Sequence, residues 1–138
     1  MKAIDLSVAK GAIFSDDRKY RYALWRVWSQ TRPILAYIGL NPSIASELSD
    51  DPTVTRIMVR ANQNGFGGLI HGNLYAYIST NPLNLVNHSQ TIGELTDYYI
   101  QEIVRLSKIQ LCGWGSFKPV AHRWQAVLAI LKEPYCLS

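Results

Sequence analysis

Residues 34–43 read Ile-Leu-Ala-Tyr-Ile-Gly-Leu-Asn-Pro-Ser, a continuous apolar run that ends in a polar turn. An uninterrupted apolar run is typical of a parallel strand that is covered on both faces. The proline disfavours helical backbone at the residue before it, so the strand ends near Asn41. This stretch therefore predicts a central parallel strand that passes into the turn Gly39-Leu40-Asn41-Pro42-Ser43.

Strands and helices alternate on the C-terminal side of this run. Asp51 and Pro52 are typical of a helix start, with Asp51 as the N-cap, and Asn64-Gly65 closes that helix. We further expect a strand over 69–78, a helix after a capping box formed by Thr91 and Glu94, a strand over 109–113, a helix over about 119–132 and a short strand over 135–137. The alternation predicts an α/β fold, with a three-layer, doubly wound, mainly parallel sheet of about four strands and helices on both faces.

The N-terminal segment has a different pattern. Residues 10–14 and 20–28 flank a polar turn and predict an antiparallel hairpin. Basic residues outnumber acidic ones by seven to three in residues 1–32, so this segment accounts for the whole net charge of +4. A solvated surface explains that charge. The alternative is a rim that contacts nucleic-acid phosphates through Arg18, Lys19 and Arg21.

The length of 138 residues fits one domain, residues 1–138, made of the basic hairpin segment 1–32 and a parallel α/β core 33–138. No apolar stretch approaches the ~20 residues that span a bilayer, and the first residues do not resemble a signal peptide. Cys112 and Cys136 lie in apolar stretches without a paired spacing, which indicates reduced thiols. We therefore expect a cytoplasmic protein that does not contact membranes, and its oligomeric state stays open.

Several polar or aromatic residues follow the predicted strands. In doubly wound sheets, ligands bind beyond the carboxyl ends of the strands, so Asn41, residues 79–81 and Trp114 should share one edge. Pro42 restrains the backbone next to Asn41, whose amide can orient a water molecule and also donate to a ligand. An Asn-Pro turn without a function explains the same residues equally well.

Two further sets of residues are candidates for chemistry. Asp50 and Asp51 could act as a general base or hold Mg²⁺, although capping alone explains Asp51. Trp114 lies between two glycines, where a base could stack on its ring, whereas Tyr75 in a strand is more often a core residue. His71 is expected in the core or on a sheet face. Metal-ligand spacings and nucleotide-binding glycine motifs are absent, so we expect no metal and no cofactor.

Four motifs in sequence order resemble one family of bacterial and phage proteins. They are Asn41-Pro42-Ser43, Asp51-Pro52-Thr53, Asn73-Leu74-Tyr75-Ala76 and Gly113-Trp114-Gly115. In this order and spacing they resemble domain-of-unknown-function family 1643, from about Arg18 to the C-terminus. This chain lacks the family's C-terminal tail with a His-Pro pair, and it reads Tyr77-Ile78-Ser79-Thr80 where members tend to carry an arginine or another polar residue. The resemblance implies no activity.

A looser likeness does imply one. A buried strand ending in Gly-x-Asn-Pro is similar to the first active-site motif of the uracil-DNA glycosylase superfamily, in which an asparagine positions the hydrolytic water in some branches. No later loop here matches the second motif of that superfamily. The likeness implies a protein that recognises a nucleobase, a nucleotide or nucleic acid, and a hydrolase of N-glycosidic bonds if it is an enzyme.

The residues proposed for that role fall into two sets. The catalytic candidates are Asn41, Asp50 and Asp51, and the ligand-binding candidates are Gly39, Pro42, Ser43, Asn73, Tyr75 and Trp114. Two other classes of function stay open. One is a non-catalytic module that binds nucleic acid or protein at the same edge. The other is a magnesium-dependent phosphohydrolase that uses the carboxylates of residues 47–51.

Overall fold

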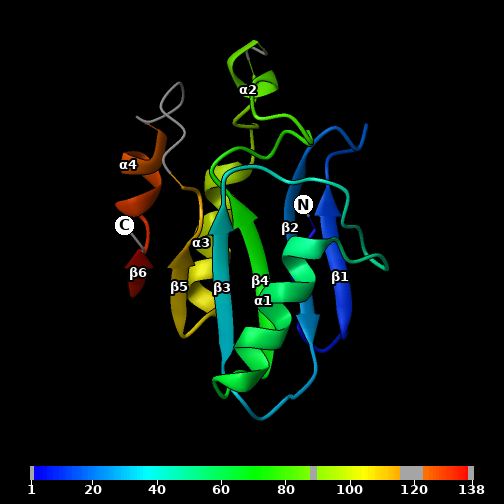
Figure 1. Cartoon of the computed structure of the whole chain (residues 1–138), viewed down its shortest axis with the longest axis vertical. Coiled ribbons are helices and arrows are strands. Elements are labelled where there is room, and N and C mark those ends of the chain that lie inside the picture. Colours follow the sequence, from blue (N-terminus) through cyan, green and yellow to red (C-terminus); the bar gives the residue numbers. More distant parts are fainter. Residues whose placement is uncertain (1, 88–89, 116–122, 137–138) are drawn as a thin grey trace.

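A computed structural model describes residues 2–87, 90–115 and 123–136 (Figure 1). The elements in chain order are β1 (Lys10–Phe14), β2 (Arg21–Val27), β3 (Ile34–Gly39), α1 (Pro52–Gln63), β4 (Gly68–Asn73), α2 (Asn84–Asn87), α3 (Thr96–Leu106), β5 (Ile109–Cys112), α4 (Arg123–Leu128) and β6 (Pro134–Cys136). The predicted α/β class is confirmed.

The described strands form one six-stranded sheet in the order β1-β2-β4-β3-β5-β6. β3 runs parallel to β4 and β5, and β5 runs parallel to β6, whereas β2 is antiparallel to both β1 and β4. The N-terminal hairpin therefore continues the sheet instead of standing beside it. The sheet has six strands and not the predicted four, because β2 pairs with the parallel core along residues 24–27.

The chain reverses its direction of travel across the sheet at β3. From β3 the chain passes through α1 to β4, which lies between β3 and β2 in the sheet. From β4 it passes through α3 to β5, which lies next to β3 on the opposite side, toward β6. In Figure 1, α1 lies in front of the sheet and α3 lies behind it. The carboxyl end of β3 is therefore the switch point at which ligands bind in open parallel sheets.

Apolar side chains pack on both faces of the sheet, since neighbouring residues of a strand point to opposite faces. Leu35 and Leu69 pack with Val54 of α1, while Ala36 and Ile70 pack with the α3 side. Each fully buried aliphatic side chain of this size contributes ~1.5–3 kcal/mol. The predicted start of α1 is also found, because Asp51 Oδ1 accepts a hydrogen bond from Val54 N at 2.8 Å.

Three predicted boundaries differ from the structure. β4 ends at Asn73 and not at Ile78, because the backbone N–H groups of the following residues bond to other segments, as with Ala76 N and Ile92 O at 3.0 Å. The predicted capping box is wrong, since α3 begins at Thr96 and Thr91 instead donates its hydroxyl to Leu85 O. Of the helix predicted over about 119–132, the described residues show only α4, Arg123–Leu128, and residues 119–122 lie outside the described residues.

A β-bulge changes the direction of one side chain on β2. Ile13 pairs with Ala23, but the next residue, Phe14, pairs with Arg21, so Tyr22 is an extra residue in β2. An extra residue interrupts the alternation of side chains. Ala23 remains in the core on the α3 side, whereas Arg21 reaches His71 on the α1 side.

Two observations concern the cysteines and the helices. Cys112 is disulfide-bonded, and the other cysteine of the sequence, Cys136, is its register partner on β6. The expectation of a reduced thiol is therefore wrong for Cys112. The sequence pattern does not reveal this, because the two cysteines are distant in sequence and come close only through the pairing of adjacent strands. In the part of the chain that the structure describes, no helix is long and apolar enough to cross a membrane.

Candidate functional site

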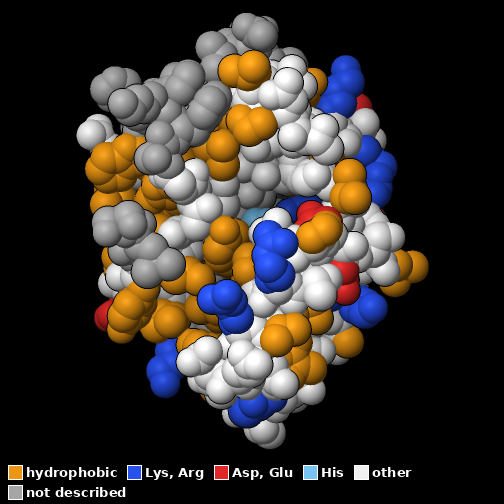
Figure 2. Space-filling model, in the orientation of Figure 1, with side chains coloured by type: hydrophobic (Ala, Val, Ile, Leu, Met, Phe, Trp, Pro, Cys, Tyr) orange, Lys and Arg blue, Asp and Glu red, His pale blue; other side chains and the backbone are white. Residues whose placement is uncertain are grey.

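A small pocket of about 170 Å³ lies at the carboxyl ends of β3, β4 and β5. Its lining residues come from these strand ends, from the turn after β3 and from the start of α1: Tyr37, Gly39, Leu40, Asn41, Ser43, Asp51, Thr53, His71, Asn73 and Gly113. Figure 2 shows a hollow on this face with the colour of histidine at its floor. Three strands of the sheet thus supply side chains or backbone to one pocket.

His71 presents a single N–H group toward this pocket. Arg21 Nη2 lies 3.1 Å from His71 Nδ1, and because a guanidinium can only donate, Nδ1 accepts and Nε2 carries the proton. Burial lowers the pKa of His71 well below its usual value, and the nearby charge of Arg21 lowers it further, while Asn73 opposes both to a smaller extent. His71 is therefore a neutral hydrogen-bond donor at pH 7.

The floor of the pocket holds polar atoms without partners. His71 Nε2 and both polar atoms of the Asn73 side chain are buried, and apart from the interaction of these two side chains with each other, none has a hydrogen-bond partner among the described residues. A Cβ atom built on Gly39 would lie 2.9 Å from Asn73 Oδ1 and 3.1 Å from His71 Nε2. The missing side chain of Gly39 thus leaves open the space that these two groups border. Unpaired buried polar groups cost ~1–3 kcal/mol each, which a complementary ligand would offset.

Arg21 is buried behind His71 and holds the imidazole ring through its contact with Nδ1. Its side chain is 1 % exposed, and its Nη1 donates to Ala45 O at 2.9 Å. Burial lowers the pKa of Arg21 to about 10, and the negative charge of Asp51 opposes this shift. A buried guanidinium cannot contact a surface phosphate, so the predicted place of Arg21 in a basic rim is wrong. The bulge in β2 turned it inward.

The other two residues of the predicted basic rim lie on the surface. Arg18 pairs with Glu47 through two hydrogen bonds of 3.1 and 3.0 Å, and its guanidinium lies 3.9 Å from the centre of the Phe14 ring. Lys19 is exposed. Neither residue lines the pocket, and their contact with nucleic acid stays a prediction.

Asn41 lines the pocket and joins two loops. Its Nδ2 donates to Ser79 O at 2.8 Å and to Pro42 O at 3.2 Å. Asn41 and the segment after Tyr77 therefore do lie at one edge of the sheet. Since Nδ2 is occupied by backbone carbonyls, Oδ1 is the atom through which Asn41 could orient water. Ser43 also lines the pocket, whereas Pro42 is buried outside its lining.

The carboxylates of residues 47–51 are dispersed. Asp51 is 5 % exposed and lines the pocket while it caps α1. Asp50 instead accepts from Arg26 Nε at 2.7 Å and does not line the pocket. Glu47 is paired with Arg18. Among the described residues, no group of three or more His, Cys, Asp and Glu side chains could hold a metal ion.

The aromatic candidates lie outside the lining of the pocket. Tyr75 is a buried core residue, and Trp114 is half-buried and packs against the same core. The aromatic wall is instead Tyr37, whose hydroxyl donates to Gly113 O at 3.1 Å. Its ring meets the ring of His71 edge to face, with centroids 5.1 Å apart. Burial raises the pKa of Tyr37, and the charge of Arg56 opposes this shift.

A family model described as a protein of unknown function, DUF1643, matches residues 21–138. This chain belongs to the DUF1643 family. The match begins at Arg21 and includes every residue that lines the pocket. No curated protein and no solved structure matched the chain.

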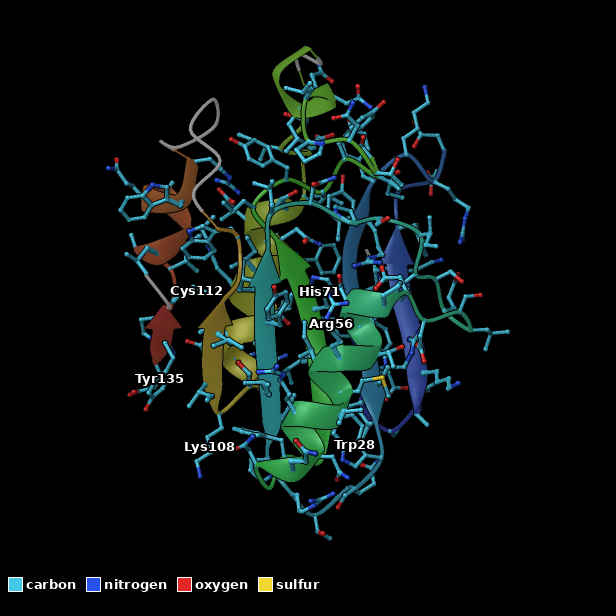
Figure 3. The ribbon with its side chains drawn as sticks, viewed as in Figure 1. Trp28, Arg56, His71, Lys108, Cys112 and Tyr135 are labelled. Atoms are coloured by element: carbon cyan, nitrogen blue, oxygen red, sulfur yellow. The ribbon has the colours of Figure 1, made fainter. Side chains whose placement is uncertain are left out.

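In this DUF1643 protein, Tyr37 and His71 line the pocket although the sequence did not predict them as site residues. The predicted site residues that line it are Gly39, Asn41, Ser43, Asp51 and Asn73. A signal was present, because residues two apart in a strand share a face. Tyr37 must therefore share a face with Gly39, and His71 must share one with Asn73. Figure 3 labels His71 at this place, beside the first turns of α1.

Proposed function

We propose that the pocket recognises a nucleobase, either free or as part of a nucleotide or nucleic acid. The observation that carries this proposal is the pair of buried, unpartnered side chains, His71 and Asn73, that face one cavity. His71 offers a donor, and the Asn73 amide offers both a donor and an acceptor. An edge with adjacent carbonyl and N–H groups, as several bases have, satisfies both side chains.

The size and walls of the pocket support a single flat ring. Its volume of about 170 Å³ is below the ~300–1,000 Å³ typical of pockets that enclose drug-sized ligands. This is the volume that about five or six water molecules occupy in liquid water. Tyr37 offers an aromatic wall, and bases bind well against aromatic rings. The pocket therefore suits the base and leaves any sugar outside.

A hydrolytic step at an N-glycosidic bond is a second candidate function, in keeping with a uracil-DNA glycosylase-like architecture. Asn41 and Asp51 line the same pocket as the base-recognising pair. Asn41 would orient water toward the sugar carbon, and Asp51 would stabilise the positive charge that develops on the sugar. The C–N bond would break with its electron pair passing to the base, the water oxygen would bond to the sugar carbon, and the proton that the water loses would pass to the departing base. Asp50 has no part in this step, because Arg26 holds it outside the lining.

The test is calorimetric titration with uridine, cytidine, adenosine and guanosine. Gly39→Ala places a methyl group against Asn73 and His71 and should weaken binding of the recognised nucleoside by at least tenfold, about 1.4 kcal/mol. Thr55→Ala, an exposed change on α1 outside the lining, should bind as the wild type does. Thermal unfolding of Thr55→Ala should stay close to the wild-type curve. Gly39→Ala, whose methyl group crowds Asn73 Oδ1, should unfold at a lower temperature but remain folded at the temperature of the titration.

Absence of binding by all four nucleosides, or unchanged binding by Gly39→Ala, would remove the proposal. Release of free base from nucleosides or from oligonucleotides separates the two candidate functions. A pure binding module shows saturable binding and no release over long incubation.

A further inference from the structure

We propose that the ligand carries a phosphate and that Arg56 of α1 binds this phosphate at the mouth of the pocket. This inference rests on the proposed recognition of a base and adds the chemical class of the whole ligand, a nucleoside monophosphate or the equivalent unit of a nucleic acid. It also places the phosphate contact on α1 and not on the N-terminal hairpin.

The interior of the pocket is unsuited to the phosphate itself. Its volume of about 170 Å³ suits one ring, so the remainder of a nucleotide must lie outside. Asp51 lines the pocket and presents a negative charge to an anion there, whereas Arg21, whose charge offsets it, is outside the lining and donates to Ala45 O and His71 Nδ1. The phosphate of a base-bound ligand therefore has to lie at the rim.

Arg56 stands at that rim. α1 begins at the pocket, where Thr53 lines it, and Arg56 follows about one helical turn later. Arg56 Nη2 lies 3.4 Å from Thr53 Oγ1, and its charge acts on Tyr37, the aromatic wall. Figure 3 labels Arg56 on α1, in front of the sheet, and Figure 2 shows Lys or Arg side chains next to the hollow.

The positive charge of Arg56 is not neutralised by an ion pair among the described residues, so it can attract an anionic ligand. Four other arginines form ion pairs, namely Arg18, Arg26, Arg105 and Arg123. Arg56 is exposed and has no ion pair within the described part of the chain; its one hydrogen bond there is the long contact to Thr53. A guanidinium binds phosphate through paired hydrogen bonds, and the positive end of a helix dipole adds to the attraction.

An independent observation indicates that a ligand belongs at this end of α1. The unpartnered Nε2 of His71 and the amide of Asn73 lie in the same pocket, with side chains more than nine-tenths buried. One ligand could therefore bind with its base inside the pocket and its phosphate at the mouth.

The experiment compares each of the four nucleosides with its 5′- and 3′-monophosphate at low salt. The proteins are the wild type, Arg56→Gln and the matched control Arg60→Gln, an exposed arginine one turn farther along α1. For the recognised base, the wild type should bind a monophosphate at least tenfold more tightly than the nucleoside. Arg56→Gln should lose this gain and keep its nucleoside affinity, and Arg60→Gln should keep both.

Equal affinity for nucleoside and monophosphate would overturn the inference while base recognition stands, and so would a gain that survives Arg56→Gln. Inorganic phosphate is the third probe. If it binds as tightly as the monophosphates, the anion site is independent of the base, and the inference is again wrong. If nucleosides and monophosphates all fail to bind, the proposed function itself fails.

Discussion

A contact between two buried residues, Arg21 and His71, determines what the pocket can recognise. The guanidinium donates to Nδ1 and leaves the proton on Nε2. A neutral imidazole with this one tautomer can only donate into the pocket, which excludes a ligand that offers a donor there. Because Arg21 already carries a positive charge beside His71, the contact also disfavours protonation of the imidazole.

This contact predicts a pH dependence of stability. In the unfolded chain His71 takes up a proton below about pH 6.5, whereas the folded protein resists protonation because the pKa of His71 is lowered well below that value. The unfolded state then binds more protons, so stability falls as the pH falls below ~6.5, by up to about 1.4 kcal/mol per pH unit. Above pH 7 this contribution is fully present.

Chemical unfolding of the wild type and of His71→Gln between pH 5 and pH 7.5 measures this effect. The glutamine does not titrate, and every other ionisable group is common to both proteins. The wild type should lose stability relative to the variant as the pH falls. Parallel curves would mean that folded His71 takes up a proton as readily as a free histidine, and that it is not a locked donor.

At the scale of single elements, β2 shows why part of the site was beyond prediction. Strict alternation places Arg21 on the face of Ala23 and Trp25, and the bulge moves it to the other face. The extra residue arises from the pairing of β2 with β1, which the sequence pattern does not show. Arg21 and Arg26 then hold the loop after β3 through Ala45 O and Ser46 O.

The start of α1 was predictable, because capping uses local sequence alone. Asp51 is an N-cap in the structure, and the same residue lines the pocket. The sequence indicated Asp51 both as an N-cap and as a candidate site residue. It did not show that Arg21 lies close enough to Asp51 to interact with its negative charge.

Two substitutions of Asp51 separate its cap from its charge. Asp51→Ala removes both, whereas Asp51→Asn keeps an oxygen that can accept from Val54 N. Both variants lose the charge that offsets Arg21, so the difference between them reports the cap. We expect the alanine variant to be less stable than the asparagine variant by ~1 kcal/mol in chemical unfolding. Equal stability of the two variants would show that the bond to Val54 contributes nothing.

At the scale of the whole molecule, the α/β class followed from the sequence, whereas the strand order that makes β3 the switch point did not. Strands that are buried on both faces read as apolar runs, and the helices between them show their own periodicity. The end of β4 was misplaced because Leu74, Tyr75 and Ala76 are also buried, so the apolar pattern continues where the strand does not. The union of the hairpin with the core depends on pairing between β2 and β4, which sequence periodicity cannot show.

The charge distribution of the molecule changes the functional expectation. The surplus of basic residues in residues 1–32 suggested a phosphate-binding rim. In the folded chain, Arg21 and Arg26 are buried and Arg18 is paired with Glu47. Much of that surplus therefore holds the loop after β3 in place. Arg56, an exposed arginine without an ion pair within the described residues, lies on α1 instead.

The most direct measurement of base recognition is an NMR titration of ¹⁵N-labelled protein with the four nucleosides. If the pocket reads a base through His71 and Asn73, one nucleoside should shift the signals of His71 Nε2 and the Asn73 side-chain amide in a saturable way. The exposed amide of Asn62 should stay unchanged. If both pocket signals remain in place at saturating concentrations of every nucleoside, the pocket does not recognise a base and the account is wrong.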